Sequence, residues 1–246
     1  MKNIRYTILV IFSLFLFQDL NAQDKGKSFI GISSGLAFPT GQFAKSDYGT
    51  FGHENDKAGF GKTGFNITLD GAYYFLPKIG WGGIASFMDH GGLNNSDVNK
   101  LAAGYTDAFG VAESTVEAQG RYRTINLMTG PYLSFPLKKF TLDFRAVAGV
   151  VKSLSTPTIT VTLEDQSTFT QRSSTAAAFG WQAGAGARYA LSNTFSLSLR
   201  GDYFQTSGIK ISNDNRTNNA GRLVTKQPLA GINIAIGVSY SFRNRK

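Results

Sequence analysis

Residues 58–64 (AGFGKTG) combine glycines with a lysine and a threonine, the residue types that bind phosphate groups. Gly59, Gly61 and Gly64 fit the G-x-G-x-x-G spacing of a dinucleotide-binding turn, which requires a strand before it and a helix after it. Residues 46–58 lack a strand pattern and residues 65–75 alternate as a strand, so no dinucleotide site is expected. A P-loop fails as well, because its first glycine position holds Asp56. The glycines are instead expected where a loop re-enters a strand, since glycine tolerates unusual dihedral angles.

Nucleophilic catalysis would require a histidine beside a hydroxyl group, oriented by an acid. The chain has two histidines, and Ser86 with His90 is the local candidate pair. Such a pair could serve a lipid A hydrolase or acyltransferase, but a polar residue at a membrane rim is the favoured interpretation of His90. The chain has no cysteine, which excludes disulfides and thiolate metal sites. No EF-hand calcium loop occurs either, so the sequence predicts a non-enzymatic protein without cofactor or metal.

The first residues predict export. Lys2 and Arg5 precede an apolar run over residues 7–17, and Ala22 offers a small residue at a cleavage position. This pattern is typical of a signal peptide, here 1–22, and the run is too short to span a membrane. The mature chain, 23–246, is expected to be a single domain. Its net charge is positive, from +9 for the whole chain, and export favours phosphate-bearing lipids over nucleic acid as the partner.

Eight segments alternate apolar and polar residues with the period of two that is typical of β-strands. They lie within residues 30–38, 65–75, 81–89, 124–135, 140–150, 179–191, 195–203 and 232–242. The third is the least clear, with Ile84 and Met88 set against Gly83, Ala85 and Phe87. Tight connections at 77–80, 136–139 and 192–193 alternate with long polar ones at 39–63, 90–120, 152–175 and 206–227. Helical spacing predicts a short helix over residues 97–109, with Ser96 as its N-cap.

The alternation fits a soluble ligand-binding barrel or a barrel that turns its apolar face to lipid. Three features favour a barrel that turns its apolar face to lipid: short turns at one rim, long loops at the other, and aromatic residues near the strand ends. Those aromatic residues are Phe75, Phe135, Phe140, Tyr189, Phe195, Tyr240 and Phe242. We therefore predict an all-β, eight-stranded antiparallel transmembrane β-barrel, with short periplasmic turns, long extracellular loops and both termini in the periplasm.

Charged residues of both signs occur on the polar face of the strands. An arginine at the bilayer midplane costs roughly 2–4 kcal/mol, so these charges are expected in the lumen. The predicted structural network of ion pairs comprises Asp70, Asp143, Arg145, Arg188, Arg200 and Asp202. A selectivity or transport role is the alternative for these residues. Inward glycines at 31, 35, 180, 184 and 186 could leave space for a conduit.

Arg121 and Arg123 begin the fourth segment at the long-loop rim and share the outward parity of Ile125. Arginine pairs well with phosphate, so the two side chains could contact lipopolysaccharide. The alternative, that both lie in water at the end of a loop, is equally favoured by the sequence.

Three segments carry a resemblance to a known family: Pro39-Thr40-Gly41-Gln42-Phe43-Ala44, residues 61–64 and the final strand 237–242 (GVSYSF). They resemble the small outer-membrane β-barrel domain proteins of Bacteroidota, which share the architecture of the OmpX and OmpW porin-family barrels. The resemblance covers residues 27–242 and implies an integral protein of the bacterial outer membrane. It also implies a C-terminal aromatic signal, here Tyr240 and Phe242, read by the barrel assembly machinery. Residues 243–246 depart from the pattern, in which the aromatic residue ends the chain.

The predicted function is that of a monomeric, non-enzymatic barrel with a structural or surface-interaction role, in contact with outer-membrane lipid. One alternative is a passive channel or transporter for small or apolar solutes. Another is an accessory component of an outer-membrane secretion system.

Overall fold

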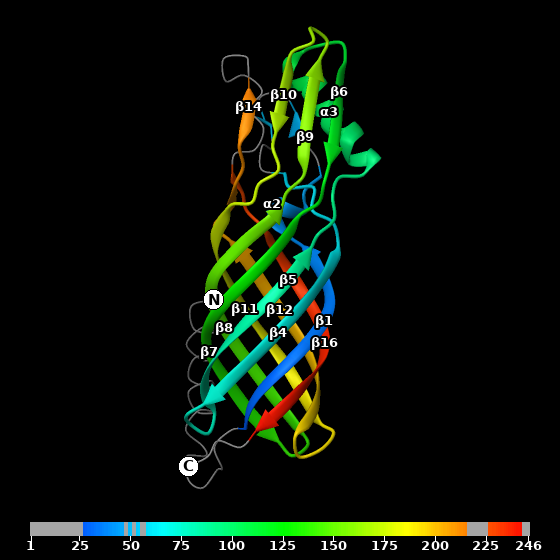
Figure 1. Ribbon diagram of the computed structural model, residues 1–246. Helices are drawn as coiled ribbons and strands as arrows, with labels where there is room; N and C mark the ends of the chain where they lie inside the picture. The colour runs from blue at the N-terminus through cyan, green and yellow to red at the C-terminus, as the bar shows by residue number, and fades with distance from the viewer. Residues whose placement is uncertain (1–26, 47–48, 51–52, 55–57, 216–225, 243–246) are drawn as a thin grey trace, which may run out of the picture.

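The computed structural model describes residues 27–46, 49–50, 53–54, 58–215 and 226–242. Eight antiparallel strands form a closed barrel in the order β1-β16-β12-β11-β8-β7-β5-β4 (Figure 1). These strands are β1 (Ser28–Pro39), β4 (Gly64–Tyr74), β5 (Ile79–Asp89), β7 (Arg123–Leu137), β8 (Phe140–Ser155), β11 (Ala177–Ala190), β12 (Phe195–Thr206) and β16 (Ala230–Phe242). The all-β, eight-stranded antiparallel barrel predicted from the alternation is confirmed.

The first and last strands close the barrel, and their pairing sets Ser28 opposite Phe242. This places both ends of the described chain at one rim, together with the short turns after β4, β7 and β11 (Figure 1). The three tight connections predicted from the sequence are confirmed. Lys138, in the turn between β7 and β8, adopts φ 54°, an uncommon conformation for a residue with a side chain.

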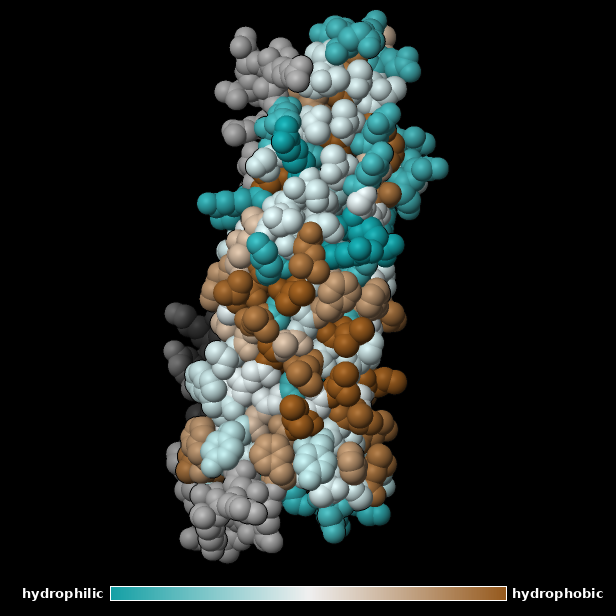
Figure 2. Space-filling view, in the orientation of Figure 1, coloured by the Kyte–Doolittle hydropathy of each residue, from teal (hydrophilic) through white to brown (hydrophobic). Residues whose placement is uncertain are grey.

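The barrel wall is inverted relative to a soluble protein, with large apolar side chains outside and charged ones inside. Each strand contributes exposed apolar residues, among them Ile32, Leu69, Trp81, Leu127, Phe144, Trp181, Leu199 and Ile236. Because these exposed residues come from all eight strands, they form a hydrophobic belt around the barrel. The face seen in Figure 2 shows this belt below a hydrophilic upper part. In β5 the apolar members of the pattern point inward, since Ile84 and Met88 are 4% and 1% exposed. Small outward residues in that strand, such as Gly83 and Ala85, had hidden its true parity.

The long connections contain additional short strands that were not predicted from the sequence. They form a second sheet in the order β14-β10-β9-β6, from β6 (Ser114–Gln119), β9 (Thr158–Leu163), β10 (Thr168–Gln171) and β14 (Asn213–Asn215). Helix α3 (Asn95–Phe109) packs on this sheet, and the two share a hydrophobic core that includes Leu101, Tyr105, Val161 and Phe169. This sheet and helix, here called the lobe, stand above the barrel on the side opposite the short turns (Figure 1).

Helix α3 begins at Asn95, before the predicted start at residue 97, and ends at Phe109 as predicted. Its N-cap is Asn94 instead of Ser96. The Asn94 side chain accepts a hydrogen bond from the Asp97 backbone, and the Asp97 carboxylate accepts one from the Asn94 backbone. This reciprocal capping box satisfies two backbone donors that a helix start otherwise leaves unpaired. Gly110 ends the helix in the left-handed conformation, with φ 62°. None of the described helices is long and apolar enough to cross a membrane.

Short elements occupy the junction between barrel and lobe, here called the neck. They are α2 (Gly41–Ala44), β13 (Ile209–Lys210) and β15 (Lys226–Gln227). The paired strands β2 (Gly49–Thr50) and β3 (His53–Glu54) belong to the first long connection, and β2 contacts α3 of the lobe. The glycine-rich residues 58–63 run through this region as coil before β4, without the helix that a nucleotide site needs. The positive φ of this stretch belongs to Phe60, at 53°. Gly59 and Gly61 serve another purpose: a Cβ atom there would lie 2.6 and 2.8 Å from the Phe43 ring.

Candidate functional site

The lumen contains all six charged residues of the predicted network, and each of them is buried. Arg145 on β8 holds Asp202 on β12 through two parallel hydrogen bonds, both 2.8 Å long. This fork geometry matches a planar guanidinium group to a planar carboxylate, which makes it one of the stronger ion-pair arrangements. A second contact of Arg145, from Nη1 to Asp70 on β4, measures 3.2 Å.

Asp70 links opposite walls of the barrel. Its Oδ2 atom accepts contacts from Arg145 on β8 and, at 2.8 Å, from Arg200 on β12. Strands β7 and β5 separate β8 from β4 on one side, and β16 and β1 separate β12 from β4 on the other. The ion pairs therefore cross the lumen instead of running along its wall. Three acids and three bases balance one another, which is what buried charges require.

The remaining pair of the network joins Arg188 on β11 to Asp143 on β8. Two hydrogen bonds connect them, at 2.6 and 2.9 Å. The Arg188 guanidinium carbon also lies 4.0 Å from the centre of the Phe29 ring, a cation–π contact. Tyr74 donates a long hydrogen bond to the same Asp143 carboxylate, 3.5 Å in length. This pair thus occupies an aromatic setting near the rim of the short turns.

The inward glycines of β11 do not leave empty space, contrary to the expectation that motivated a conduit. Gly184 lies between Arg145 and Asp202 in the strand register, and Gly186 lies between Asp143 and Arg200. A Cβ atom at Gly184 would come 2.1 Å from the Asp202 carboxylate, and one at Gly186 would come 2.9 Å from Arg200. These glycines make room for the charged side chains of the neighbouring strands.

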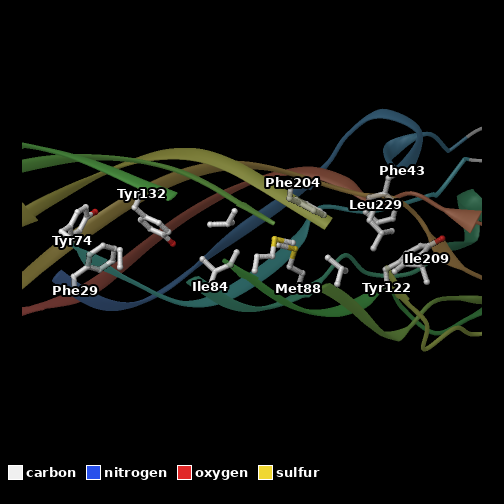
Figure 3. Close-up of a cluster of buried hydrophobic side chains, with 14 residues drawn as sticks. Phe29, Phe43, Tyr74, Ile84, Met88, Tyr122, Tyr132, Phe204, Ile209 and Leu229 are labelled. Carbon is white, nitrogen blue, oxygen red and sulfur yellow. The ribbon is translucent and has the colours of Figure 1, made fainter. Parts of the chain in front are cut away.

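Buried apolar side chains follow the barrel axis from the rim of the short turns toward the lobe. Figure 3 shows them in succession, from Tyr74, Phe29 and Tyr132 through Ile84 and Met88 to Phe204, Leu229 and Phe43. All belong to one buried hydrophobic cluster. Buried apolar side chains therefore lie in the lumen on both sides of the ion pairs.

Phe43 closes the barrel at its mouth. Helix α2 carries this side chain into the neck, where it makes edge contacts with His90 and Tyr122, each with ring centres 5.1 Å apart. The His90 ring also stacks on Phe204 at 5.7 Å. Burial lowers the pKa of His90 to about 4, although the Lys62 backbone and the Asp89 carboxylate act in the opposite direction. Burial likewise raises the pKa of Tyr122, so both rings are neutral in the folded neck.

The structure does not assemble a catalytic pair from Ser86 and His90. The Ser86 hydroxyl accepts a hydrogen bond from the Asn126 side chain at 3.0 Å. His90 lies among aromatic rings, and within the described residues neither of its ring nitrogens makes a hydrogen bond of standard geometry. The described part of the chain also contains no group of three or more acidic, histidine or cysteine residues that could hold a metal ion.

Arg121 and Arg123 lie at the rim below the lobe, and their side chains are about half exposed, at 52% and 48%. Both contact the buried carboxylate of Asp89, at 3.0 Å in each case. Sequence reasoning had not connected Asp89 with these arginines. Strand pairing brings them together, since Asp89 and Arg123 are partners across β5 and β7. One carboxylate thus orients two guanidinium groups whose outer sides remain open.

Tyr240 and Phe242 lie on the outward face of β16, the last strand. The Tyr240 ring packs edge-on against Phe195 of β12, with centres 5.5 Å apart. Phe140 and Tyr189 form a similar pair at 4.9 Å, which gives the rim of the short turns an aromatic girdle. The predicted signal peptide, 1–22, and its predicted cleavage site lie outside the described residues, and so do residues 243–246.

The comparison with solved structures finds similarity to outer-membrane proteins. Neisserial surface protein A is 10% identical to this chain, and the alignment covers 89% of this chain and 100% of the Neisserial protein, with a TM-score of 0.42. The attachment invasion locus protein Ail of Yersinia pestis is 13% identical over 89% and 99%, with a TM-score of 0.41. The outer membrane protease OmpT of Escherichia coli is 11% identical over 91% and 99%, at 0.42. No family model matches the sequence, and no curated protein matches it.

Proposed function

We propose that this protein is an integral outer-membrane barrel with a blocked lumen, whose role is to hold the folded lobe outside the cell as a surface for contacts. The proposal is non-enzymatic, in agreement with a Ser86–His90 pair that is not assembled. The observation that carries it is the layer of ion pairs across the lumen, with buried apolar side chains on both sides, because a barrel obstructed in this way leaves the lobe as its accessible part.

A membrane location is supported by the inverted wall. Soluble monomers rarely expose a continuous apolar patch beyond a few hundred Å², whereas here the belt encircles the barrel and includes residues of all eight strands (Figure 2). Transmembrane barrels of the bacterial outer membrane carry such a band, flanked by aromatic girdles. A soluble ligand-binding barrel would place its apolar residues inside, where this chain has its ion pairs.

The lobe has a surface suited to contacts with other molecules. Its core uses one face of the sheet, so alternate residues of the same strands point to the opposite face. That face is rich in threonine: Thr115, Thr158, Thr160, Thr162, Thr168 and Thr170. The register sets Thr162 opposite both Thr115 and Thr168, so the hydroxyl groups lie in rows across the strands.

Conductance measurements test the blocked lumen. We expect no stepwise current when the full chain is inserted into planar bilayers, because ion pairs cross the lumen and Phe43 fills its mouth. A variant lacking the Phe43 ring, Phe43→Ala, should remain closed, since the charged layer lies deeper. A steady conductance of the native chain would reject the blocked lumen and would favour the alternative function, a passive channel. No observation favours an accessory role in secretion.

Surface labelling tests the orientation. A short epitope inserted in the 164–167 turn, between β9 and β10, should bind antibody on intact cells. The same epitope in the 191–194 turn should react only after the outer membrane is permeabilised. Equal labelling at the two positions, or recovery of the protein in the soluble periplasm, would contradict this placement.

The proposal has three further parts. The barrel assembly machinery recognises Tyr240 and Phe242, the protein is a monomer, and it belongs to the Bacteroidota family of small barrels. The outward position of both aromatic residues supports the first. Replacing Phe242 by alanine should reduce the amount of folded barrel in the outer membrane without changing the amount synthesised.

A further inference from the structure

Basic and acidic side chains lie at different levels along the barrel axis. The lumen is balanced, and the described side chains at the neck and upper rim are predominantly basic: Lys45, Lys62, Arg121, Arg123, Lys152, Lys210 and Lys226. Among the described acidic side chains, Asp89 contacts Arg121 and Arg123 at this level, and Asp97 at the start of α3 pairs with Lys62 at 2.7 Å. The lobe above is predominantly acidic, through Asp97, Asp107, Glu113, Glu117, Glu164, Asp165 and Asp214. On the face seen in Figure 2, hydrophilic side chains begin where the hydrophobic belt ends.

One group of these bases lies on β7 and β8 and is here called the arginine cluster. It consists of Arg121, Arg123 and Lys152. Lys152 is exposed and pairs in register with Ile125, two residues below Arg123 on the same outward face. Asp89 neutralises one charge of the cluster, and Lys152 forms no ion pair with any described residue. The cluster therefore keeps a net positive charge on an exposed surface.

A second group lies beside β12 and β16 and is here called the lysine pair. Lys210 of β13 and Lys226 of β15 are direct cross-strand partners, and both are exposed. Like charges placed opposite each other across two strands destabilise the pairing. Neither lysine forms an ion pair with a described residue, so the strands hold two positive charges together without compensation from that part of the protein.

We propose that the arginine cluster and the lysine pair bind the phosphate groups of outer-leaflet lipids. This inference rests on the proposed membrane location, which places both groups at the level of the lipid headgroups. Arginine presents several donors in a planar fork that matches phosphate oxygens, and an anion between two lysines removes the repulsion between them. Acidic residues of the lobe repel other anions from above, so a phosphate held at the surface of the membrane is favoured over one approaching from solution.

Titration with lipid A tests the proposal. The full chain, refolded in micelles of a zwitterionic detergent, is titrated with lipid A carrying both phosphates and with the dephosphorylated form. We expect tighter binding of the phosphorylated form. The double variants Arg121→Gln/Arg123→Gln and Lys210→Gln/Lys226→Gln should each weaken that binding by about fivefold for each charge removed. Neither should change binding of the dephosphorylated lipid.

The matched control is Lys138→Gln/Lys139→Gln, which removes the same charge from the opposite rim, in the turn between β7 and β8. It should bind phosphorylated lipid A as the native chain does. Loss of Arg121 and Arg123 leaves the Asp89 carboxylate without its two ion-pair partners and can impair folding, but the lysine pair has no ion pair with a described residue to lose. Its variant should fold, and in the absence of lipid it should be as stable as the native chain or more stable.

Three results would overturn the inference. They are equal binding of the two lipid A forms, native affinity in the lysine-pair variant, and full displacement of lipid A by an equal concentration of inorganic phosphate. A chain that refolds in micelles and shows any of them contradicts lipid phosphate binding alone. A chain that fractionates with soluble proteins and does not insert contradicts the proposed function itself.

Discussion

Arg145 is the residue on which the lumen network depends most directly. It holds Asp202 through two hydrogen bonds and also contacts Asp70 across the barrel. Removing one partner of a buried ion pair leaves an uncompensated charge in a medium that solvates it poorly. Replacing both partners by apolar residues avoids that penalty, so the single substitution is the informative one.

The substitution Arg145→Met keeps the length of the side chain and removes its charge. It should lower the free energy of unfolding by about 3–5 kcal/mol, because Asp202 loses its forked partner. Denaturant unfolding of the chain folded into lipid vesicles measures the loss. Lys139→Met, at an exposed turn, is the control and should change the stability little. Native stability of the Arg145 variant would show that the network does not hold the barrel together.

His90 makes the stability of the neck depend on pH. Its folded pKa of about 4 lies below the ordinary value of 6.5, so between these values the unfolded chain binds a proton that the folded neck does not. The free energy of unfolding therefore rises with pH across this window. The contribution, present above pH 6.5 and lost toward pH 4, amounts to roughly 3 kcal/mol.

A His90→Phe variant tests this sign. Phenylalanine suits the rings of Phe43 and Phe204 that surround the position, and it does not titrate. Unfolding curves at pH 7.5 and pH 5 should show a smaller decrease for the variant than for the native chain, since carboxylates titrate equally in both. The same decrease in the two proteins would rule out His90 as the source.

At the scale of elements, helix α3 depends on its first turn. Its capping box predicts that Asn94→Ala costs about 1 kcal/mol of helix stability, which raises the population of the opened helix about fivefold. Hydrogen exchange of the α3 amides measures this opening. Ser96→Ala is the matched control, two positions into the helix, and should leave the exchange rates close to native. A larger effect at Ser96 would restore the cap predicted from the sequence.

The eight barrel strands and three short turns could be predicted because each strand has two chemically different faces. Alternation then fixes both the strand and its orientation, as in residues 65–75 of β4. Strand β5 does not follow this pattern. Its outward face is built from small residues and its inward face carries Ile84 and Met88, so hydrophobicity alone gave the wrong parity there.

The lobe was missed because its strands lie in long polar connections. Residues 158–163 (TITVTL) do alternate, and this signal could have found β9. The partners of β9 could not be found in the same way, since β10 has only four residues and β6 is separated from β9 along the chain by the barrel strands β7 and β8. For the same reason the sequence named the charged residues of the lumen without naming their pairs. Which arginine meets which aspartate depends on strand register around the whole ring.

At the scale of the whole molecule, the belt predicts how charge is tolerated on the outer wall. Ile236, at mid-strand in β16, is 65% exposed, and Leu191, in a short turn, is 62% exposed. In a soluble protein, arginine at either position would change stability little. If the belt faces lipid, Ile236→Arg should cost about 2–4 kcal/mol and Leu191→Arg no more than about 1 kcal/mol.

Reversible unfolding from lipid vesicles compares the two variants directly. Equal costs, or no cost at Ile236, would mean that the wall does not face the hydrocarbon. The comparison is informative because the two side chains have nearly the same exposure and differ in their height along the barrel axis.

The continuity between lobe and barrel has a mechanical consequence. Strand β9 follows β8, β10 leads into β11, and β6 leads into β7, each through a few residues. A pull on the 164–167 tip, directed away from the membrane, therefore runs along the strands. Hydrogen bonds perpendicular to that direction share the load in shear instead of opening in turn. Force spectroscopy from a handle at this tip should record one high-force event, and stepwise unzipping at low force would contradict it. Such a geometry would let the lobe keep hold of a partner while the cell is pulled by flow.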